Sequence, residues 1–444
     1  MRRVLSSVAA VGLTLAATFA VTSSPASAAT GTFSVLSYNI AGLPEGLSSA
    51  PTPRQSSTTT IGRRIAAYNL VTVQEDFNYH SYLYAEDAHP YRTPTSGGAG
   101  IGSGLNTLSG NAYDVDDFER GRWNSCQLDS GDCLTPKGYT FQRVRLAEGV
   151  YVDVYNLHTN AGTTSGDQTS RADNLAQLTS VIATHSAGNA VIVMGDTNTR
   201  YTRAADTIRG FVSANGLTDA WVQLIRAGSA PAAGSDALVC DPAATTNACE
   251  TVDKVLYRGS RLVNLSATAF NNEHAKFLET SSGLMLSDHD PVTAGFSWST
   301  NTALQLSDQF GGPHGTYFTD VATVPATGRV TAVALRAGTR VDRIATTLST
   351  GLTYAHGGTG GTESTLTLAT GEHLSSLYLC RGSYSDTTRI FYARWTTTLG
   401  RTLAGGTTTS DCTTFTAPTG WHITAFHGRA GDELDKLGVV YTRN

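Results

Sequence analysis

Residues 190–198 read AVIVMGDTN, an apolar run that ends in the polar motif Gly195-Asp196-Thr197-Asn198. The run from Ala190 to Gly195 is short, rich in Val and Ile and followed by turn residues, which predicts a β-strand. A single Gly-Asp at a strand end is usually a loop. The motif is therefore informative only if similar polar residues follow other strands.

A similar sequence pattern extends over residues 33–298, where short apolar strands alternate with amphipathic segments. The other predicted strands are Phe33 to Asn39, Leu70 to Gln74, Tyr139 to Leu146, Val150 to His158, Lys254 to Arg258 and Val292 to Trp298. Apolar residues recur with the spacing of one helix face over Arg171 to His185 and Ala204 to Asn215. This part of the chain is therefore predicted to be a mixed α/β domain.

After Trp298 the helical periodicity ends, and Gly and Thr punctuate short alternating strands such as Val330 to Leu335, Arg340 to Leu348 and His422 to Gly428. Gly pairs recur at Gly311-Gly312, Gly357-Gly358 and Gly405-Gly406, which indicates a threefold arrangement of small sheets. The length of 444 residues also exceeds that of a usual single domain. We therefore expect two domains, at residues 29–300 and 304–444.

The first 28 residues have the anatomy of a secretory signal peptide. Arg2 and Arg3 precede an apolar run from Val8 to Val21, and the small-residue site Ala26-Ser27-Ala28 follows. The alternative is a membrane anchor, but the run is shorter than the roughly 20 residues that a span needs. We expect cleavage after Ala28, an extracellular protein and no transmembrane segment.

The six cysteines form three close pairs along the chain: Cys126 with Cys133, Cys240 with Cys249, and Cys380 with Cys412. An exported chain meets an oxidising environment, so these pairs predict three disulfides, although six cysteines allow 15 connectivities. A metal-thiolate site is the alternative, and no Cys-x-x-Cys spacing supports it. The net charge of −5 gives no overall basic field for nucleic acid, but a local group of Arg could still bind phosphate.

Polar residues gather at five predicted strand ends: Ser37-Tyr38-Asn39, Val73-Gln74-Glu75, Asn156-Leu157-His158, Gly195 to Asn198, and Ser287-Asp288-His289-Asp290-Pro291. Each motif alone has an ordinary reading as a turn. Together they hold the groups that hydrolysis of a phosphate ester needs: hard oxygens for Mg²⁺, Asp and Asn to orient water, and His to donate to phosphoryl oxygens.

This ordered set resembles the endonuclease/exonuclease/phosphatase superfamily, which includes deoxyribonuclease I and the neutral sphingomyelinases, over about residues 31–298. The resemblance implies an α/β four-layer sandwich, two β-sheets flanked by helices, with the active site at one end. It also implies a metal site formed by Glu75 and Asn39, with Asp288 nearby, that takes Mg²⁺ or Mn²⁺.

The resemblance further implies the catalytic roles. His289 matches the catalytic histidine and Asp253 the carboxylate that orients it. Asp196 and Asn198 match the residues that position the nucleophilic water, and His158 matches a second histidine that donates to a phosphate oxygen. Two positions depart from the usual pattern, Thr197 and Asp290, and these put the fit of the substrate in doubt rather than the metal site.

The tail resembles a jacalin-type lectin from about Leu306 to Tyr441, chiefly through Phe426 to Asp432 and the following Leu434 to Gly438. This implies a C-terminal all-β domain, a β-prism of three four-stranded sheets. Such lectins bind sugars through a Gly-x-x-x-Asp loop, and Gly428 to Asp432 has that spacing. The expected sugar ligands are Asp432 and, from the opposing loop, Gly312. A stabilising or protein-binding module is the alternative.

These features predict a secreted, metal-dependent phosphoesterase directed by a carbohydrate-binding domain. The segment Asp132 to Gly138 ends in Lys-Gly directly before a predicted strand, and this is similar to the start of a strand in sphingomyelinase-like members. The similarity favours a phosphodiesterase of the sphingomyelinase or phospholipase C kind, acting on phospholipid. Six Arg (120, 122, 143, 145, 200 and 203) could instead form a rim for a deoxyribonuclease I-like endonuclease acting on nucleic acid or for an inositol-polyphosphate phosphatase. The non-enzymatic alternative is a glycan-binding surface protein with an inactive phosphoesterase domain.

Overall fold

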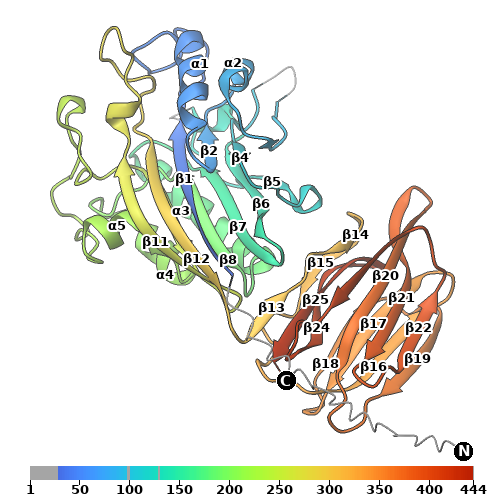
Figure 1. Cartoon of the computed structure of the whole chain (residues 1–444). Helices are drawn as coiled ribbons and strands as arrows, with labels where there is room; N and C mark the ends of the chain where they lie inside the picture. Colours follow the sequence, from blue (N-terminus) through green and yellow to red (C-terminus); the bar gives the residue numbers. More distant parts are fainter. Residues whose placement is uncertain (1–28, 98–100, 129–130, 444) are drawn as a thin grey trace, which may run out of the picture.

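The computed structural model describes residues 29–97, 101–128 and 131–443, so the predicted signal peptide lies outside the described residues. Two bodies lie side by side in Figure 1: a mixed body that contains α1 to α5 and an all-strand body that contains β13 to β25. Across the described chain, every helix falls short of the length and apolar character that a membrane crossing requires.

Two six-stranded sheets form the first body. One has the order β11 (Val263–Asn272), β12 (Val292–Thr300), β1 (Thr30–Asn39), β2 (Leu70–Gln74), β4 (Asn106–Ser109) and β3 (Tyr91–Arg92). The other has the order β5 (Glu119–Arg122), β6 (Gly138–Ala147), β7 (Val150–His158), β8 (Ala190–Asp196), β10 (Asp253–Arg258) and β9 (Thr218–Asp219). All seven strands predicted for this part are present.

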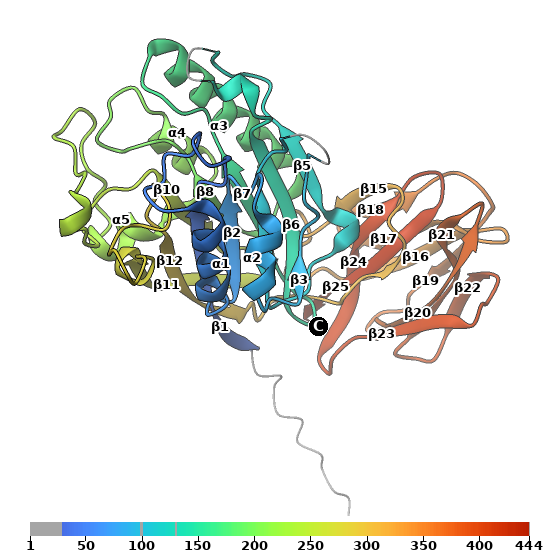
Figure 2. The same cartoon turned by 90° about the horizontal axis from the view of Figure 1, so that it is seen from above.

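Helices cover the outer faces of both sheets, as Figure 2 shows. On one side lie α1 (Arg54–Ile65) and α2 (His80–Glu86), and on the other α3 (Ser165–His185), α4 (Ile208–Ala214) and α5 (Ala220–Ile225). Short 3-10 turns occur at Val115–Asp117, Asp132–Leu134, Pro242–Ala244 and His274–Lys276. The layers run helix, sheet, sheet, helix, which confirms the predicted four-layer sandwich.

Alternation along the strands produces these layers. In β1, Val35 faces the core between the sheets, whereas Leu36 and Tyr38 face the core under α1. In β8, Ile192 lies in the inter-sheet core and Val193 packs under α3. Each of these strands is therefore buried on both faces, which explains its near-continuous apolar sequence.

The helices differ from the sequence-based expectation at their ends. The helix α3 begins at Ser165 rather than Arg171, because Thr164 and Asp167 form a capping box that starts it earlier. The helix α4 begins only at Ile208, since the Asp206 N–H donates to the Arg203 carbonyl in a tight turn. No helix was predicted at α1, whose Ser, Thr and Gly residues have low helix propensity.

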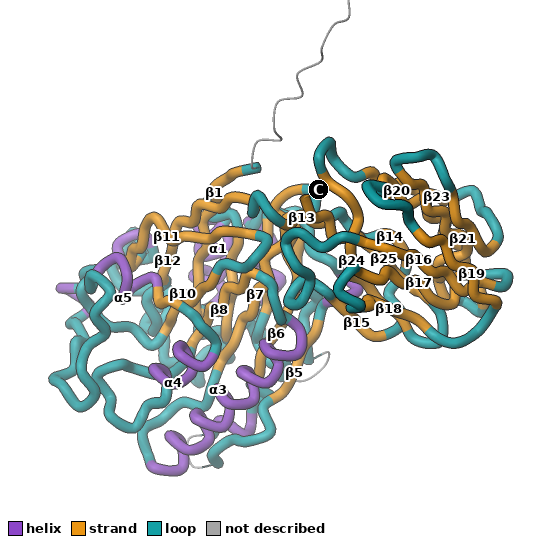
Figure 3. Tube along the Cα trace, turned by 90° about the horizontal axis from the view of Figure 1, so that it is seen from below, coloured by secondary structure: helices purple, strands orange, loops and turns teal. Residues whose placement is uncertain are grey.

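The second body contains three sheets arranged as a prism, and every element drawn there in Figure 3 is a strand. The first joins β13 (Leu304–Leu306), β25 (Leu434–Arg443), β24 (Trp421–Ala430) and β15 (Thr316–Thr319), with β14 (Phe310–Gly311) also paired to β25. The second has β18 (Thr353–Gly357), β17 (Val341–Leu348), β16 (Val330–Ala337) and β19 (Thr362–Thr367). The third has β22 (Thr402–Gly406), β21 (Thr387–Thr397), β20 (Leu374–Tyr384) and β23 (Asp411–Thr416). This confirms the β-prism, with a fifth strand in the first sheet.

All three predicted disulfides are formed, at Cys126–Cys133, Cys240–Cys249 and Cys380–Cys412. The first two close short loops of the sandwich, and the third links adjacent strands β20 and β23. No cysteine is left free. A thiolate metal site is therefore excluded in this oxidised structure.

Ion pairs join the two bodies. Asp308, just after β13, accepts hydrogen bonds from the Arg145 guanidinium at 2.8 Å, the Gly149 N–H at 3.0 Å and the Tyr151 hydroxyl at 2.6 Å. Lys436 on β25 lies 2.6 Å from Asp116 of the sandwich. The prism is therefore held against β6 and β7 by charged contacts as well as by apolar packing.

Candidate active site

The five polar motifs meet at one end of the sandwich because of strand direction. The strands β1 and β2 are parallel and place Asn39 opposite Gln74 at their carboxyl ends. The strands β7 and β8 are also parallel and place His158 opposite Asp196. Antiparallel β10 then sets Asp253 beside Asp196. Strand register thus gathers side chains at one end of each sheet, and the packing of the two sheets brings these ends together.

Asn39 joins the two sheets at this end. Its side-chain nitrogen donates to Glu75 at 3.1 Å and to Asp196 at 3.2 Å, and its side-chain oxygen accepts the Ala41 N–H at 3.0 Å. The residue is fully buried. Three bonds fix the amide, so Asn39 sets the distance between a carboxylate of one sheet and a carboxylate of the other.

Glu75 projects from a strained turn directly after β2. Its φ of 58° lies in the left-handed region, which a residue with a side chain rarely adopts. Two glycines make room for the turn: a Cβ at Gly42 would lie 2.2 Å from the Glu75 carbonyl oxygen, and one at Gly104 would lie 2.9 Å from its Cα. The surrounding chain therefore holds Glu75 in an unusual conformation that directs its carboxylate to Asn39.

His289 and Asp253 form a hydrogen-bonded pair. The His289 Nδ1 lies 2.8 Å from Asp253, and its Nε2 lies 3.7 Å from Asp196. Burial lowers the pKa of His289, but the two neighbouring carboxylates outweigh it and raise this pKa well above its usual value. Burial raises the pKa of Asp253 to about 6, although His289 opposes the shift. The pair is thus electrostatically coupled and oriented.

Asp196 is the shared acceptor of the cluster. It accepts from Asn39, and His158 Nε2 lies 3.2 Å from it. Burial acts to raise its pKa, but the charges of His289 and His158 dominate and lower it. Its other oxygen accepts the backbone N–H of Asn198 at 2.9 Å. The carboxylate therefore stays ionised and oriented among two histidines and an amide.

Asp196, Asp253 and His289 offer ligand atoms that all lie within 4.8 Å of one another. The structure therefore brings together Asn39, Glu75, Asp196, Asp253, His158 and His289. Asn198 stands at the rim with a φ of 48° and donates to the Thr159 carbonyl at 3.2 Å. Asp288 is exposed, and its nearest recorded contact is the Ser287 hydroxyl at 3.4 Å.

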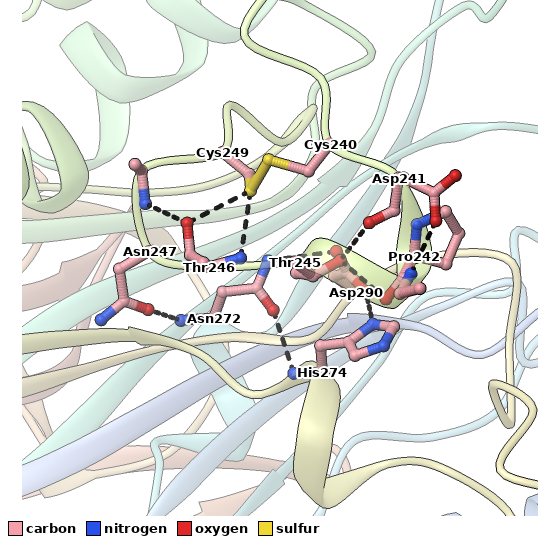
Figure 4. The surroundings of a disulfide bond; sticks show 12 residues. Cys240, Asp241, Pro242, Thr245, Thr246, Asn247, Cys249, Asn272, His274 and Asp290 are labelled. Carbon is pink, nitrogen blue, oxygen red and sulfur yellow. Dashed lines mark hydrogen bonds and ion pairs between the residues drawn. A yellow bond between two sulfur atoms is a disulfide. The ribbon is translucent and has the colours of Figure 1, made fainter.

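A cavity of about 360 Å³ opens beside this cluster. His289, Asp253 and Asn198 line one side, and the loop closed by Cys240–Cys249 lines the other. Figure 4 shows how this loop is held: Asn247 accepts the Asn272 N–H at 2.7 Å, and the Asn272 side chain donates to Asp290 at 3.1 Å.

Asp290 also lies 2.7 Å from His274 Nδ1. Since Asp290 follows His289 in the chain, this network ties the loop to the catalytic candidate. Asp290 is one of the two positions that differ from the usual pattern, and here its carboxylate holds Asn272 and His274 in place.

Sequence reasoning placed Asn156 at a strand end but gave it no role. Its side chain donates to the Val73 carbonyl at 2.9 Å and to the Asn106 carbonyl at 3.0 Å, and it accepts from Gln74 at 2.8 Å. This is a second buried amide that joins the two sheets beneath the site. The sequence feature that could have identified this role is the position of Asn156 at the same strand end, two residues before His158.

The two expected sugar ligands lie in neighbouring loops of the prism. Asp432 is exposed, and its backbone packs against Gly358. The Gly312 N–H instead donates at 2.9 Å to the carbonyl of Asp435, whose buried carboxylate pairs with Arg389. Gly431 to Asp435 repeats the Gly-x-x-x-Asp spacing of Gly428 to Asp432.

Two family descriptions match the chain. "Endonuclease/Exonuclease/phosphatase family 2" matches residues 55–248, and "Jacalin-like lectin domain" matches residues 307–440. The first match covers His158, Asp196 and Asn198, whereas Asn39 and the residues from Asp253 onward lie outside it.

A curated protein named sphingomyelinase from Mycobacterium tuberculosis (strain ATCC 25618 / H37Rv) is 43% identical over 281 residues, which cover 62% of this chain and 54% of that protein. A protein of the same name from Mycobacterium bovis matches to the same extent. The chain thus spans about half the length of the curated relatives it matches.

Among solved structures, sphingomyelinase C from Streptomyces griseocarneus is 19% identical with a TM-score of 0.41, covering 60% of this chain and 99% of that one. A Malaysian banana lectin variant is 28% identical with a TM-score of 0.29, covering 32% of this chain and 99% of the lectin. The fold assignment rests on the sheet order rather than on these scores. The chain combines an endonuclease/exonuclease/phosphatase domain with a jacalin-like lectin domain that follows it.

Proposed function

We propose that this protein is a secreted, divalent-metal-dependent phosphodiesterase of the sphingomyelinase or phospholipase C kind, brought to glycan-bearing surfaces by its C-terminal domain. The observation that carries the proposal is the buried cluster in which Asn39 links Glu75 to Asp196, and Asp196 faces the pair formed by His289 and Asp253. The 43% identity to proteins named sphingomyelinase supports the choice of phosphodiester.

The chain's own groups divide the work of phosphodiester hydrolysis. Asp253 binds His289 Nδ1, so Nε2 is left to exchange a proton with water or with the phosphoryl group. Asp196 and Asn198 orient the attacking water, and His158 donates to a phosphoryl oxygen. Water attacks phosphorus, one ester P–O bond breaks, and the leaving alkoxide takes up a proton.

The acidic residues fit a divalent cation. Glu75 has no basic partner among the residues the structure describes, and Asn39 keeps it beside a second buried carboxylate. Hard carboxylate oxygens without a positive counter-charge are typical of Mg²⁺ or Mn²⁺ sites. Glu75 and Asp288 would hold the ion, and Asn39 would join them through its side-chain oxygen once the amide, whose nitrogen now faces Glu75, turns over. The ion would polarise the phosphoryl oxygen and lower the pKa of water.

Secretion and targeting complete the proposal. Cleavage after Ala28 would release the mature chain, and three disulfides suit an oxidising environment. The catalytic domain would span residues 29–300 and the lectin domain residues 304–444. Sugar would bind at the loops that carry Gly312 and Asp432, with Asp435 as the neighbouring acid, and a linked lectin would raise the local enzyme concentration.

The test is hydrolysis of sphingomyelin, plasmid DNA and inositol phosphates by the purified mature protein, with Mg²⁺ or with EDTA. We expect EDTA-sensitive hydrolysis of sphingomyelin and a loss of at least about 1,000-fold in Glu75→Ala, the scale at which a group acting on developing charge contributes. Glu86→Ala is the matched control, because Glu86 lies on the exposed face of α2 and its recorded partner within the described residues is Arg63.

Each other outcome selects an alternative. Hydrolysis of DNA alone would identify an endonuclease, and hydrolysis of inositol phosphates alone a phosphatase. Activity equal in Glu75→Ala and in the parent would refute the assigned site. Inactivity toward all three substrates, with glycan binding retained, would support the non-enzymatic surface protein.

A further inference from the structure

Among the six arginines singled out in the sequence, the structure records no guanidinium partner for Arg122 and Arg200 within the described residues. Arg122 is exposed and lines a different cavity, whereas Arg200 lies beside the candidate site. Arg143 and Arg145 pair with Asp153 and Asp308, and Arg120 donates to backbone carbonyls. Arg203 pairs with Asp206 at 2.9 Å. The structure records neither a hydrogen bond nor an ion pair for the guanidinium of Arg200 within the described residues, and its Nε is buried without a partner.

The acids near Arg200 are already engaged by other donors. Asp206 accepts from Arg171 at 2.7 Å and from the backbone N–H of Arg200 at 2.8 Å. Glu250 is buried and accepts from the Thr202 hydroxyl at 2.7 Å and from the Tyr201 N–H. The positive charge of the Arg200 side chain is therefore left without a protein counter-ion at hydrogen-bond distance.

The Arg200 side chain lines the 360 Å³ cavity that also contains His289 and Asn198. Arg203 lines it as well and lies close enough for its charge to lower the pKa of Arg200, after the larger effect of burial. Arg203 keeps Asp206 as its counter-ion, so Arg200 provides the unpaired positive charge that attracts an anion. Four acids line the same cavity: Asp253 and Asp290 pair with His289 and His274, Glu250 accepts the hydrogen bonds given above, and Asp288 is exposed.

We propose that Arg200, with Arg203 beside it, forms a subsite for a second phosphate group of the substrate, next to the phosphodiester that is cleaved. This inference rests on the proposed phosphodiesterase function and narrows it. A substrate with a further phosphate would place an anion on the unpaired guanidinium, so the subsite would favour such a phosphodiester over sphingomyelin, which carries a single phosphate.

The test compares substrates that differ by one phosphate. The nucleotide pair is the p-nitrophenyl ester of thymidine 5′-phosphate with and without a 3′-phosphate. The lipid pair is phosphatidylinositol 4-phosphate and phosphatidylinositol in vesicles. We expect the parent to prefer the additional phosphate in one pair by about 10- to 100-fold in kcat/KM, the range for a hydrogen bond to a charged group. The preferred pair identifies whether the phosphate comes from a nucleotide or from a lipid.

Arg200→Gln should bring that ratio close to 1, and Arg200→Lys should restore part of it because the charge remains but the bidentate geometry is lost. The control is Arg63→Gln on the exposed face of α1, which should keep the ratio of the parent. A ratio unchanged in Arg200→Gln overturns the proposal. An equal loss on both members of a pair also overturns it, because Arg200 would then serve the cleaved phosphate.

A binding measurement separates this proposal from the activity itself. Calorimetric titration with inorganic pyrophosphate in EDTA should show affinity that falls at least about 5-fold in Arg200→Gln, with the melting temperature unchanged. If the parent hydrolyses none of the substrates but this difference persists, the phosphodiesterase assignment fails and the anion subsite stands. Equal pyrophosphate affinity in parent and variant refutes the subsite.

Discussion

At the scale of single residues, amides and histidines of this protein owe their roles to partners brought from distant strands. Asn39 is the central example, since its contact with Asp196 spans 157 positions in the sequence. His289 depends in the same way on Asp253, 36 positions away. In both cases the partner fixes the orientation of the side chain, and for His289 it also fixes which ring nitrogen carries the proton.

Asp253→Asn should lower kcat while the fold is retained. An amide can donate to His289 Nδ1 and so favour the wrong tautomer, and it removes the charge that stabilises the protonated ring. We expect a loss of about 100- to 10,000-fold, the usual contribution of a positioned acid or base. Glu119→Gln removes a carboxylate from another histidine, His185, on a different part of the domain, and should keep full turnover.

His427 should make the protein less stable in acid. Burial, with the nearby Arg143 charge, lowers the pKa of its imidazole from 6.5 to about 3, and its ring nitrogens lie 2.8 Å from the Gln309 amide nitrogen and 3.1 Å from the Ser307 carbonyl oxygen. Between pH 6.5 and about 3 the imidazole of His427 is protonated in the unfolded chain but stays neutral in the folded chain. The free energy of unfolding therefore falls as pH falls, by up to about 1.4 kcal/mol per pH unit.

Thermal unfolding of the parent and of His427→Gln between pH 4 and 7 checks this expectation. Glutamine can keep one donor and one acceptor but does not titrate, so its melting temperature should decline less steeply with acid. Identical slopes in the two proteins would show that His427 does not contribute.

At the scale of elements, the turn after β2 stores the strain that positions Glu75. Gly42 and Gly104 permit the close approach of this turn to its neighbours, and the turn is fixed by the Gly42 N–H donating to the Glu75 carbonyl at 2.9 Å. The position of the Glu75 carboxylate thus depends on how the backbone of this turn packs against its neighbours.

Gly42→Ala should displace this turn. An added Cβ would lie 2.2 Å from the Glu75 carbonyl oxygen, which is backbone and cannot rotate away. We expect at least a 10-fold loss of kcat and a destabilisation of about 1–3 kcal/mol, as for other overpacked sites. Gly210→Ala in α4, where nothing lies within 4 Å, should leave activity intact and stabilise the helix slightly. Equal behaviour of the two variants would contradict the strained-turn account.

At the scale of the whole molecule, the lectin body is fixed to the catalytic body by charged groups at several points. Besides Asp308 and Lys436, Arg429 of β24 pairs with Asp117, and Arg261 donates to the Val321 and Val324 carbonyls. Contacts of this number favour a fixed orientation of the two bodies over a flexible link. Sugar binding would then present the active site to a surface at a set angle.

Asp308→Ala should uncouple the two bodies. It removes the acceptor for Arg145, Gly149 and Tyr151 at once, at a cost of about 1–3 kcal/mol because the carboxylate is partly exposed. Differential scanning calorimetry should show two transitions that lie further apart than in the parent. Glu363→Gln, which breaks an exposed ion pair with Arg336 inside the prism, should leave the profile as it is. An unchanged profile in Asp308→Ala would refute a role for this contact in coupling.

Features of this protein that depend on local pattern can be predicted from the amino-acid order. Alternation and apolar runs located the seven strands of the sandwich, cysteine proximity predicted the disulfides, and polar motifs at strand ends marked the residues that meet at the site. These succeed because strand direction and short loops constrain where nearby residues can lie.

The partners of these residues follow from tertiary packing, which local pattern does not specify. The bridge made by Asn39, the unpaired and buried Nε of Arg200, and the contact of the Gly312 N–H with the Asp435 carbonyl all depend on chain segments far apart in sequence. The helix α1 was missed for a related reason, because tertiary burial of Arg54 and Ile61 outweighs poor local propensity. The spacing of residues in the sequence shows which polar side chains are present near strand ends, whereas tertiary packing decides which of these side chains bind one another.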